Sequence, residues 1–185
     1  MFNMNMNVII TNHGDKMKYN RLMDNFLKFR KVKVNFSYIA FGKTDAEMIV
    51  KGYEALKHCD SDSWMKLHSD STILNEEIIA NIFGNLFCNS YHYAGHKWRG
   101  RINEFATDFF FADSRFMHFF IPEIKKRVFP GVETIEQCAY RVNRMCGGYW
   151  VMDKPFNEYK ILDPVLGQTS LNRLEKAINE FSKST

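Results

Sequence analysis

The stretch SWMKLHSDSTILNEE, residues 63–77, contains a strand pattern, a polar end and a helix start in close succession. Residues 64–67 are mostly apolar and are typical of a short buried strand. His68-Ser69-Asp70 follows at once, and Asn75 is a residue type that often caps a helix. Because ligands in open α/β sheets bind at the carboxyl ends of strands, this order predicts a ligand site after residue 67.

The same order occurs twice earlier in the chain. Two further strands are predicted, and each precedes an apolar pattern with helical spacing. Thr44 and Glu47 have the spacing of a capping box at the start of the second helix. The order strand-helix, three times over, predicts an α/β fold with three layers, α/β/α, and a mostly parallel sheet. The predicted strands are Asn7–Thr11, Val34–Phe41 and Trp64–Leu67, and the helices begin near Tyr19, Thr44 and Asn75.

The second half of the chain has less regular patterns. Residues 89–104 are polar, aromatic and basic and are interpreted as a loop that borders the site. Gly147-Gly148 is a helix stop, and the whole length, residues 1–185, is typical of one domain. Other predicted elements are a strand Phe109–Ala112, a helix ending near Pro122, a helix opened by the capping box Thr134–Gln137, a strand Tyr149–Met152 and a C-terminal helix over 171–181.

Composition restricts the class of protein only mildly. The formal charge is +4, from 25 basic and 21 acidic residues, which permits an anionic ligand without indicating a nucleic-acid binder. The four cysteines have no C-x-x-C spacing and are interpreted as reduced thiols. We see no secretory signal and no apolar run of about 18 to 20 residues, so we expect a cytoplasmic protein without a membrane span.

Polar side chains follow each of the three predicted strands. In a parallel sheet these strand ends lie at one edge, so the residues are expected to share one cleft. They are Thr11, Asn12 and Asp15 after the first strand, Asp45 after the second, and His68 and Asp70 after the third, with Lys66 inside the third.

Four segments resemble nucleotide-sugar glycosyltransferases of the GT-A fold. AFGKTDAEMIVKGYEAL (40–56) is similar to their D-D-G-S-T-D stretch and its helix, and WMKLHSDSTILNEEII (64–79) to the next strand, which ends in a D-x-D motif. TDFFFADSRFM (107–117) resembles a strand before the acceptor region. VETIEQCAYRVNRMCGGYWVMD (132–153) resembles a later acidic helix that is followed by a strand. The resemblance covers roughly residues 7–153.

The resemblance implies a single GT-A-like domain that moves a sugar from a nucleotide-sugar donor to a hydroxyl acceptor. It implies that Asp70, with His68, holds Mn²⁺ or Mg²⁺, which neutralises the leaving diphosphate. Glu136 or Glu133 would be the base that takes the proton of the acceptor hydroxyl. The donor-binding residues implied are Thr11, Asn12, Asp15, Asp45, Lys66 and Asp70.

The sequence also departs from the pattern of these enzymes. Ala40-Phe41 stands where the family has an acidic pair, and residues 68–70 contain one carboxylate instead of two. A non-catalytic GT-A-like binding module is therefore an alternative. A second alternative is a nucleic-acid-binding protein that uses the basic and aromatic residues 92–101. Asp45 and Glu136 also suit a purely structural role, because acidic residues are favoured near helix N-termini.

Overall fold

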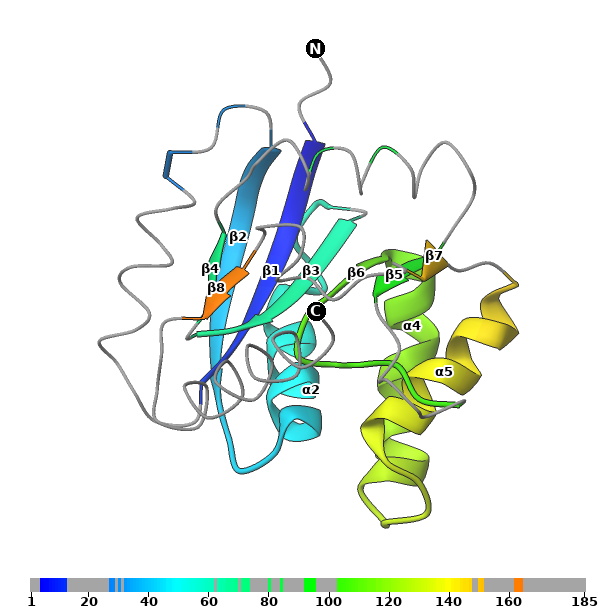
Figure 1. Ribbon diagram of the computed structural model, residues 1–185. Coiled ribbons are helices and arrows are strands. Elements are labelled where there is room, and N and C mark those ends of the chain that lie inside the picture. Colours follow the sequence, from blue (N-terminus) through cyan, green and yellow to red (C-terminus); the bar gives the residue numbers. More distant parts are fainter. Residues whose placement is uncertain are drawn as a thin grey trace, which may run out of the picture.

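The computed structural model describes residues 4–12, 27–28, 30, 32–61, 63–69, 71–73, 80, 84, 92–95, 103–147, 150–151 and 162–164. Their main feature is a six-stranded sheet of order β2-β1-β3-β6-β5-β7 (Figure 1). The strands are β1 Met4–Asn12, β2 Val32–Phe41, β3 Ser63–His68, β5 Tyr93–Gly95, β6 Phe110–Asp113 and β7 Trp150–Val151. Strand β6 runs antiparallel to both of its neighbours, whereas the other pairings are parallel. The predicted α/β fold with a mostly parallel sheet is confirmed.

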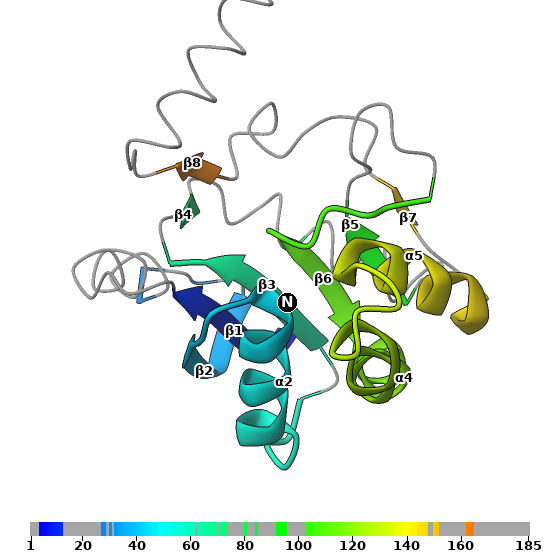
Figure 2. The same cartoon turned by 90° about the horizontal axis from the view of Figure 1, so that it is seen from below.

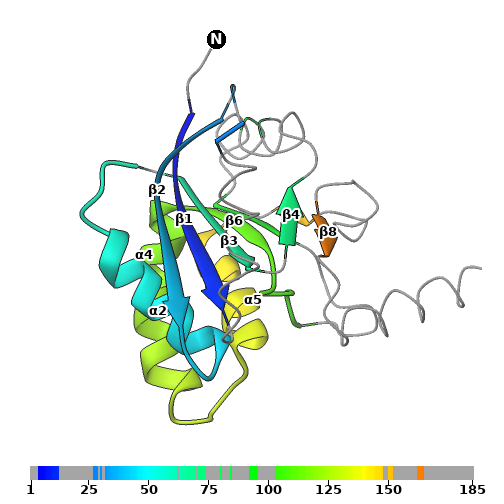
Figure 3. The same cartoon turned by 90° about the vertical axis from the view of Figure 1, so that its left-hand side faces the viewer.

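The described helices lie on one face of this sheet (Figure 2). They are α2 Asp45–Leu56, α4 Ser114–Glu123, its π-helical continuation η1 Ile124–Val128, and α5 Ile135–Cys146. On the other side lies a two-stranded pair, β4 Ser71–Ile73 with β8 Leu162–Pro164 (Figure 3). Apart from single positions, the predicted helices near 19–27, 75–86 and 171–181 lie outside the described residues. The second helical layer and the single domain over 1–185 therefore stay predictions.

Strand β1 is buried along most of its length. Its residues from Met6 to Asn12 are all buried, as expected for a parallel strand covered on both faces. On the helical face α2 approaches β1 so closely that a Cβ on Gly52 would lie 2.5 Å from Cγ2 of Ile9. The contacts of Asp45 with Lys66 and His68 place the N-terminus of α2 beside the carboxyl end of β3.

Local signals account for the helix ends. Thr44 Oγ1 accepts a hydrogen bond from the Glu47 amide at 3.2 Å, while the Glu47 carboxylate accepts from the Lys43 amide. The predicted box at α2 therefore uses Lys43 in place of Thr44 for its return bond. The box at α5 is complete, and α5 ends at Gly147 with φ 87°, a left-handed conformation that suits glycine.

The chain remains helical for longer around Pro122 than the sequence predicts. Helix α4 ends at Glu123, but the backbone continues as η1, where the Phe129 amide donates to the Ile124 carbonyl at 3.1 Å. Proline has no amide hydrogen for the carbonyl one turn earlier, yet α4 continues through Pro122 and then passes into the wider π-turn. None of the described helices is long and apolar enough to cross a membrane.

The prediction of one loop over residues 89–104 is wrong for residues 93–95. Tyr93–Gly95 is a strand inside the sheet, and Tyr93 is fully buried against the rings of Phe105, Phe110 and Phe116. A three-residue strand is too short to give a periodic signal. Gly95 serves close packing, because a Cβ there would lie 2.5 Å from the Tyr93 hydroxyl oxygen.

This strand also weakens the nucleic-acid alternative. Its residues 93–95 are buried, and His92 Nδ1 lies 2.6 Å from Asp113 Oδ2. Asp113 pairs with Ser63 at the start of β3, so His92 is at the edge of the sheet opposite the carboxyl ends. Residues 96–102, which carry most of the basic and aromatic side chains of this alternative, lie outside the described residues.

Candidate functional site at the carboxyl rim

The carboxyl rim is our name for the end of the sheet where β1, β2 and β3 terminate and where the antiparallel β6 begins. Asp45, the first residue of α2, lies there between two residues of β3. Lys66 Nζ and His68 Nε2 each lie 3.2 Å from Asp45 Oδ2. The Lys66 side chain is 1% exposed, so its charge is stabilised by this pairing. Asp45, Lys66 and His68, which were predicted to bind the donor or a metal, are thus in contact.

The carboxyl group of Asp45 is held ionised. Burial would raise its pKa, but the charge of Lys66 and the hydrogen bonds from His68 and Lys66 together lower the pKa well below the ordinary value. A carboxylate with such a lowered pKa is a poor proton acceptor near neutral pH. Asp45 is therefore suited to hold Lys66 and His68 in position, and unsuited to act as a general base.

The segment before β6 forms the other half of the rim. Because β6 is antiparallel, Phe110 pairs with Lys66, and the residues just before Phe110 lie at the carboxyl end of β3. Lys66 Nζ donates to the main-chain carbonyl of Asp108 at 3.3 Å. The neighbouring Thr107 hydroxyl donates to Glu136 Oε1 at 3.3 Å, which joins the first turn of α5 to the rim.

Two carboxylates of this half, those of Asp108 and Glu136, act on the buried Tyr93. The pKa of Tyr93 is raised well above 10.0, first by burial and then by the negative charges of Asp108 and Glu136. The phenol therefore stays protonated, and it donates to the Ala106 carbonyl at 3.2 Å. Asp108 and Thr107 were not predicted as site residues. In the sequence they are a polar pair directly before an apolar strand. This pattern indicates a site at the rim only once the strand is known to run antiparallel.

Thr11 and Asn12 lie at the rim but are buried. The Thr11 hydroxyl donates to the Leu67 carbonyl at 3.4 Å, and the Ser69 amide donates to the Thr11 carbonyl. These bonds tie the ends of β1 and β3 together. Asp15 and Asp70 lie outside the described residues, so the expectation that Asp15, Asp45 and Asp70 share one rim stays a prediction.

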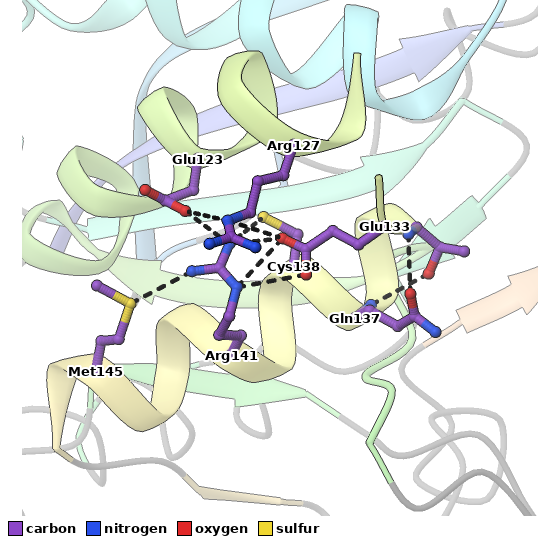
Figure 4. Close-up of polar contacts among 8 residues, drawn as sticks. Glu123, Arg127, Glu133, Gln137, Cys138, Arg141 and Met145 are labelled. Atoms are coloured by element: carbon purple, nitrogen blue, oxygen red, sulfur yellow. Dashed lines mark hydrogen bonds and ion pairs between the residues drawn. The ribbon is translucent and has the colours of Figure 1, made fainter. Parts of the chain in front are cut away.

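The two predicted bases lie in different surroundings. Glu136 contacts Thr107 at the rim, whereas Glu133 belongs to an arginine cluster formed by Glu123, Arg127, Glu133 and Arg141 (Figure 4). Arg141 donates to both oxygens of Glu133, with the shortest distance 2.6 Å. A carboxylate that accepts several guanidinium hydrogen bonds is less available to take a proton, so the geometry favours Glu136 as the base.

The described rim residues do not by themselves fit a divalent cation. His68 Nε2 is directed at Asp45, and the ammonium group of Lys66 is directed at the same oxygen, so a cation on Asp45 would face a fixed positive charge. Across the described part of the chain, no three His, Cys, Asp or Glu residues gather as metal ligands would. The metal site predicted at His68 and Asp70 depends on Asp70 and stays a prediction.

No protein-family model and no curated protein matches the sequence. Solved structures do. A glycosyltransferase involved in the glycosylation of the major capsid protein of PBCV-1 is similar with a TM-score of 0.57 and 15% identity, over 80% of this chain and 81% of that one. The glycosyltransferase GlyE of Streptococcus pneumoniae TIGR4 is similar with a TM-score of 0.56 and 10% identity, over 90% of this chain and 55% of that one. The chain has a GT-A-like fold.

The GT-A-like fold does not by itself determine the chemistry of the rim. At 10 to 15% identity the similarity is one of backbone arrangement. A fold hosts many activities, so a function has to be argued from the residues of the site. In this GT-A-like chain those residues are Asp45, Lys66, His68, Thr107, Asp108 and Glu136, which come from α2, β3, the segment before β6 and α5.

Proposed function

We propose that this chain transfers a sugar from a nucleotide-sugar donor to a hydroxyl group of an acceptor. The observation that carries the proposal is the continuous set of contacts along the rim. It runs from His68 and Asp45 through Lys66 to the Asp108 carbonyl, and from the adjacent Thr107 to Glu136. This set joins a lysine, a histidine and a carboxylate base at the end of the sheet where α/β folds bind ligands.

Glu136 is the base in this proposal. As the acceptor oxygen forms its bond to the anomeric carbon, the bond from that carbon to the diphosphate oxygen breaks, and the hydroxyl proton moves to Glu136. The Thr107 hydroxyl, which donates to Glu136 Oε1, fixes the orientation of the carboxylate and leaves Oε2 for the proton. Base catalysis of this kind typically accounts for about 10²- to 10⁴-fold in rate.

Lys66, Asp45 and His68 form the donor side of the proposed site. The buried Lys66–Asp45 pair fixes the start of α2 against β3, and this pair orients His68 at the end of the strand. Thr11, Asn12, Asp15 and Asp70 belong to the donor side as predictions, and so does a divalent cation at Asp70, which would supply charge neutralisation to the leaving diphosphate.

The test compares Glu136→Gln with Glu133→Gln. Each protein is incubated with a panel of nucleotide sugars, simple glycosides as acceptors, and Mn²⁺ or EDTA, and release of nucleoside diphosphate is measured. Glu136→Gln should lower turnover by about 10²- to 10⁴-fold with little change in melting temperature. Glu133→Gln should keep turnover and lower the melting temperature, because it removes hydrogen bonds to Arg141.

Three other outcomes would each contradict the proposed reaction or one part of it. If the wild-type chain neither binds nor consumes any nucleotide sugar, the sugar-transfer proposal fails. If it binds a nucleotide sugar without turnover, the non-catalytic binding module is favoured. If Glu136→Gln retains full turnover while Glu133→Gln loses it, the assignment of the base is wrong and the proposed reaction stands.

A further inference from the structure

Among the described residues, Asp108 at the rim has a carboxylate oxygen without a hydrogen-bond donor. Oδ1 of Asp108 is buried, and none of the described residues donates a hydrogen bond to it. Leaving a buried charged oxygen unsatisfied costs more than leaving a neutral one, on the order of 1–3 kcal/mol or above. Such groups are rare in folded proteins and call for a specific explanation.

The hydrogen-bond donors near Asp108 are directed at other acceptors. Lys66 Nζ bonds the Asp45 carboxylate and the main-chain carbonyl of Asp108, so it anchors the Asp108 backbone without reaching Oδ1. The Thr107 hydroxyl donates to Glu136, and the Tyr93 hydroxyl donates to Ala106. The buried lysine thus fixes the main chain of Asp108, and Oδ1 of its carboxylate has no donor among the described residues.

We propose that Oδ1 of Asp108 accepts a hydrogen bond from a hydroxyl group of the sugar substrate. This inference rests on the proposed function and names the substrate group that the rim recognises. The main-chain carbonyl of Asp108 contacts Lys66 on the donor side, and the adjacent Thr107 contacts the base Glu136. Asp108 therefore lies between the donor side and the base. It is a substrate-binding residue that the sequence did not indicate.

The chemistry of the position favours a neutral hydroxyl over a phosphate. Asp108 and Glu136 both place negative charge near the Tyr93 phenol, so a phosphate oxygen there would be repelled by two carboxylates. A hydroxyl group can donate its hydrogen to a carboxylate in a short, charge-assisted bond. A site built to bind one hydroxyl also rejects an analogue that lacks it.

The experiment uses Asp108→Asn, which keeps the shape of the side chain and removes its charge. Asp113→Asn is the matched control, because Asp113 lies at the opposite edge of the sheet and both of its oxygens have partners, the Phe116 amide and His92. For each protein we would measure the melting temperature, the affinity for the nucleoside diphosphate and for the matching nucleotide sugar, and the KM of a glycoside acceptor.

The expected result has two parts. Asp108→Asn should melt at the wild-type temperature or above it, because no hydrogen bond is lost, whereas Asp113→Asn should melt lower. Affinity for the bare nucleoside diphosphate should stay unchanged in Asp108→Asn. If the hydroxyl belongs to the donor sugar, the affinity for the nucleotide sugar falls by roughly 10- to 100-fold; if it belongs to the acceptor, the acceptor KM rises by a similar factor.

Other results would overturn the inference. A lower melting temperature with unchanged substrate constants would make Asp108 a structural residue. A Mn²⁺-dependent rise in melting temperature that Asp108→Asn abolishes would assign Oδ1 to a metal. In both cases the wild-type chain still uses a nucleotide sugar and the proposed function survives. Absence of any nucleotide-sugar binding by the wild-type chain would overturn both.

Discussion

Asp45 is the residue on which two basic side chains of the rim converge. Its side chain is 21% exposed, and it carries contacts to Lys66 and His68. Because its pKa is lowered in the folded chain, it contributes stability that is fully present above the ordinary carboxyl pKa of 3.8 and is lost as the pH falls below that value. The charge of Asp45 is therefore a stability determinant at neutral pH.

We expect Asp45→Asn to lower the free energy of unfolding at pH 7 by about 3–5 kcal/mol, because it leaves Lys66 buried without its counter-charge. The difference from wild type should shrink as the pH falls below 3.8, because the unfolded chain then takes up a proton at Asp45 while the folded carboxylate, with its lowered pKa, stays ionised. Urea unfolding of both proteins at a series of pH values checks this. A difference that does not change with pH would show that the charge of Asp45 is irrelevant to stability.

Cys138 provides a second prediction for a single residue. Burial, with a further contribution from Glu133, raises the pKa of its thiol from 9.0 to about 12. Since only the thiolate reacts, alkylation by iodoacetamide at pH 8 should be roughly a thousandfold slower in the folded chain than in urea. Mass spectrometry of peptides from both states measures the ratio. Equal rates would show that the thiol is exposed by frequent opening.

At the scale of elements, helix α2 packs closely against strand β1 because residue 52 is a glycine without a side chain. A Cβ at position 52 would lie 2.5 Å from Ile9 Cγ2, and Ile9 is β-branched with little freedom to move. The apolar face of α2, which includes Ile49 and Leu56, packs into the core at this point. The position of Asp45 at the rim depends on this packing.

Gly52→Ala should therefore destabilise the fold by about 1–3 kcal/mol through overpacking, although alanine is the better helix former. Ala55→Gly on the exposed side of the same helix is the control for helix propensity alone and should cost about 1 kcal/mol. Thermal unfolding of both variants gives the comparison. A stabilised Gly52→Ala variant would mean that α2 can move away from β1 without loss.

At the scale of the whole molecule, Lys66 joins parts of the chain that are far apart in sequence. Its ammonium group bonds α2 through Asp45 and the segment before β6 through the Asp108 carbonyl. The antiparallel β6 and the following helices α4 and α5 are thereby connected to the parallel strands at the rim as well as through the sheet. A single buried charge links the two halves of the proposed site.

A double-mutant cycle tests this link. Lys66→Met alone should cost about 3–5 kcal/mol, because it leaves the Asp45 carboxylate buried without its lysine. Lys66→Met combined with Asp45→Asn should cost less than the sum of the single variants, with a coupling of roughly 1–3 kcal/mol. Urea unfolding provides the four free energies. Additive effects would show that the contact contributes no stability.

The amino-acid sequence alone determined the local features of this protein. Apolar runs predicted β1, β2 and β3, and capping residues predicted the starts of α2 and α5. Strand ends also predicted Asp45, Lys66 and His68 as site residues, and the resemblance to GT-A glycosyltransferases implied Glu136 or Glu133. These signals lie within a few residues of the feature they specify, because hydrogen bonding at a helix end and the spacing of apolar side chains are local.

The tertiary structure decided which distant residues meet. The reversed direction of β6 brings Thr107 and Asp108, which precede the strand, to the rim where the parallel strands end. The structure also separated Glu136 from the arginine cluster of Glu133 and turned residues 93–95 from a predicted loop into a buried strand. Strand direction and the choice of ion-pair partner depend on contacts between residues far apart in sequence, and no local pattern of residues records them.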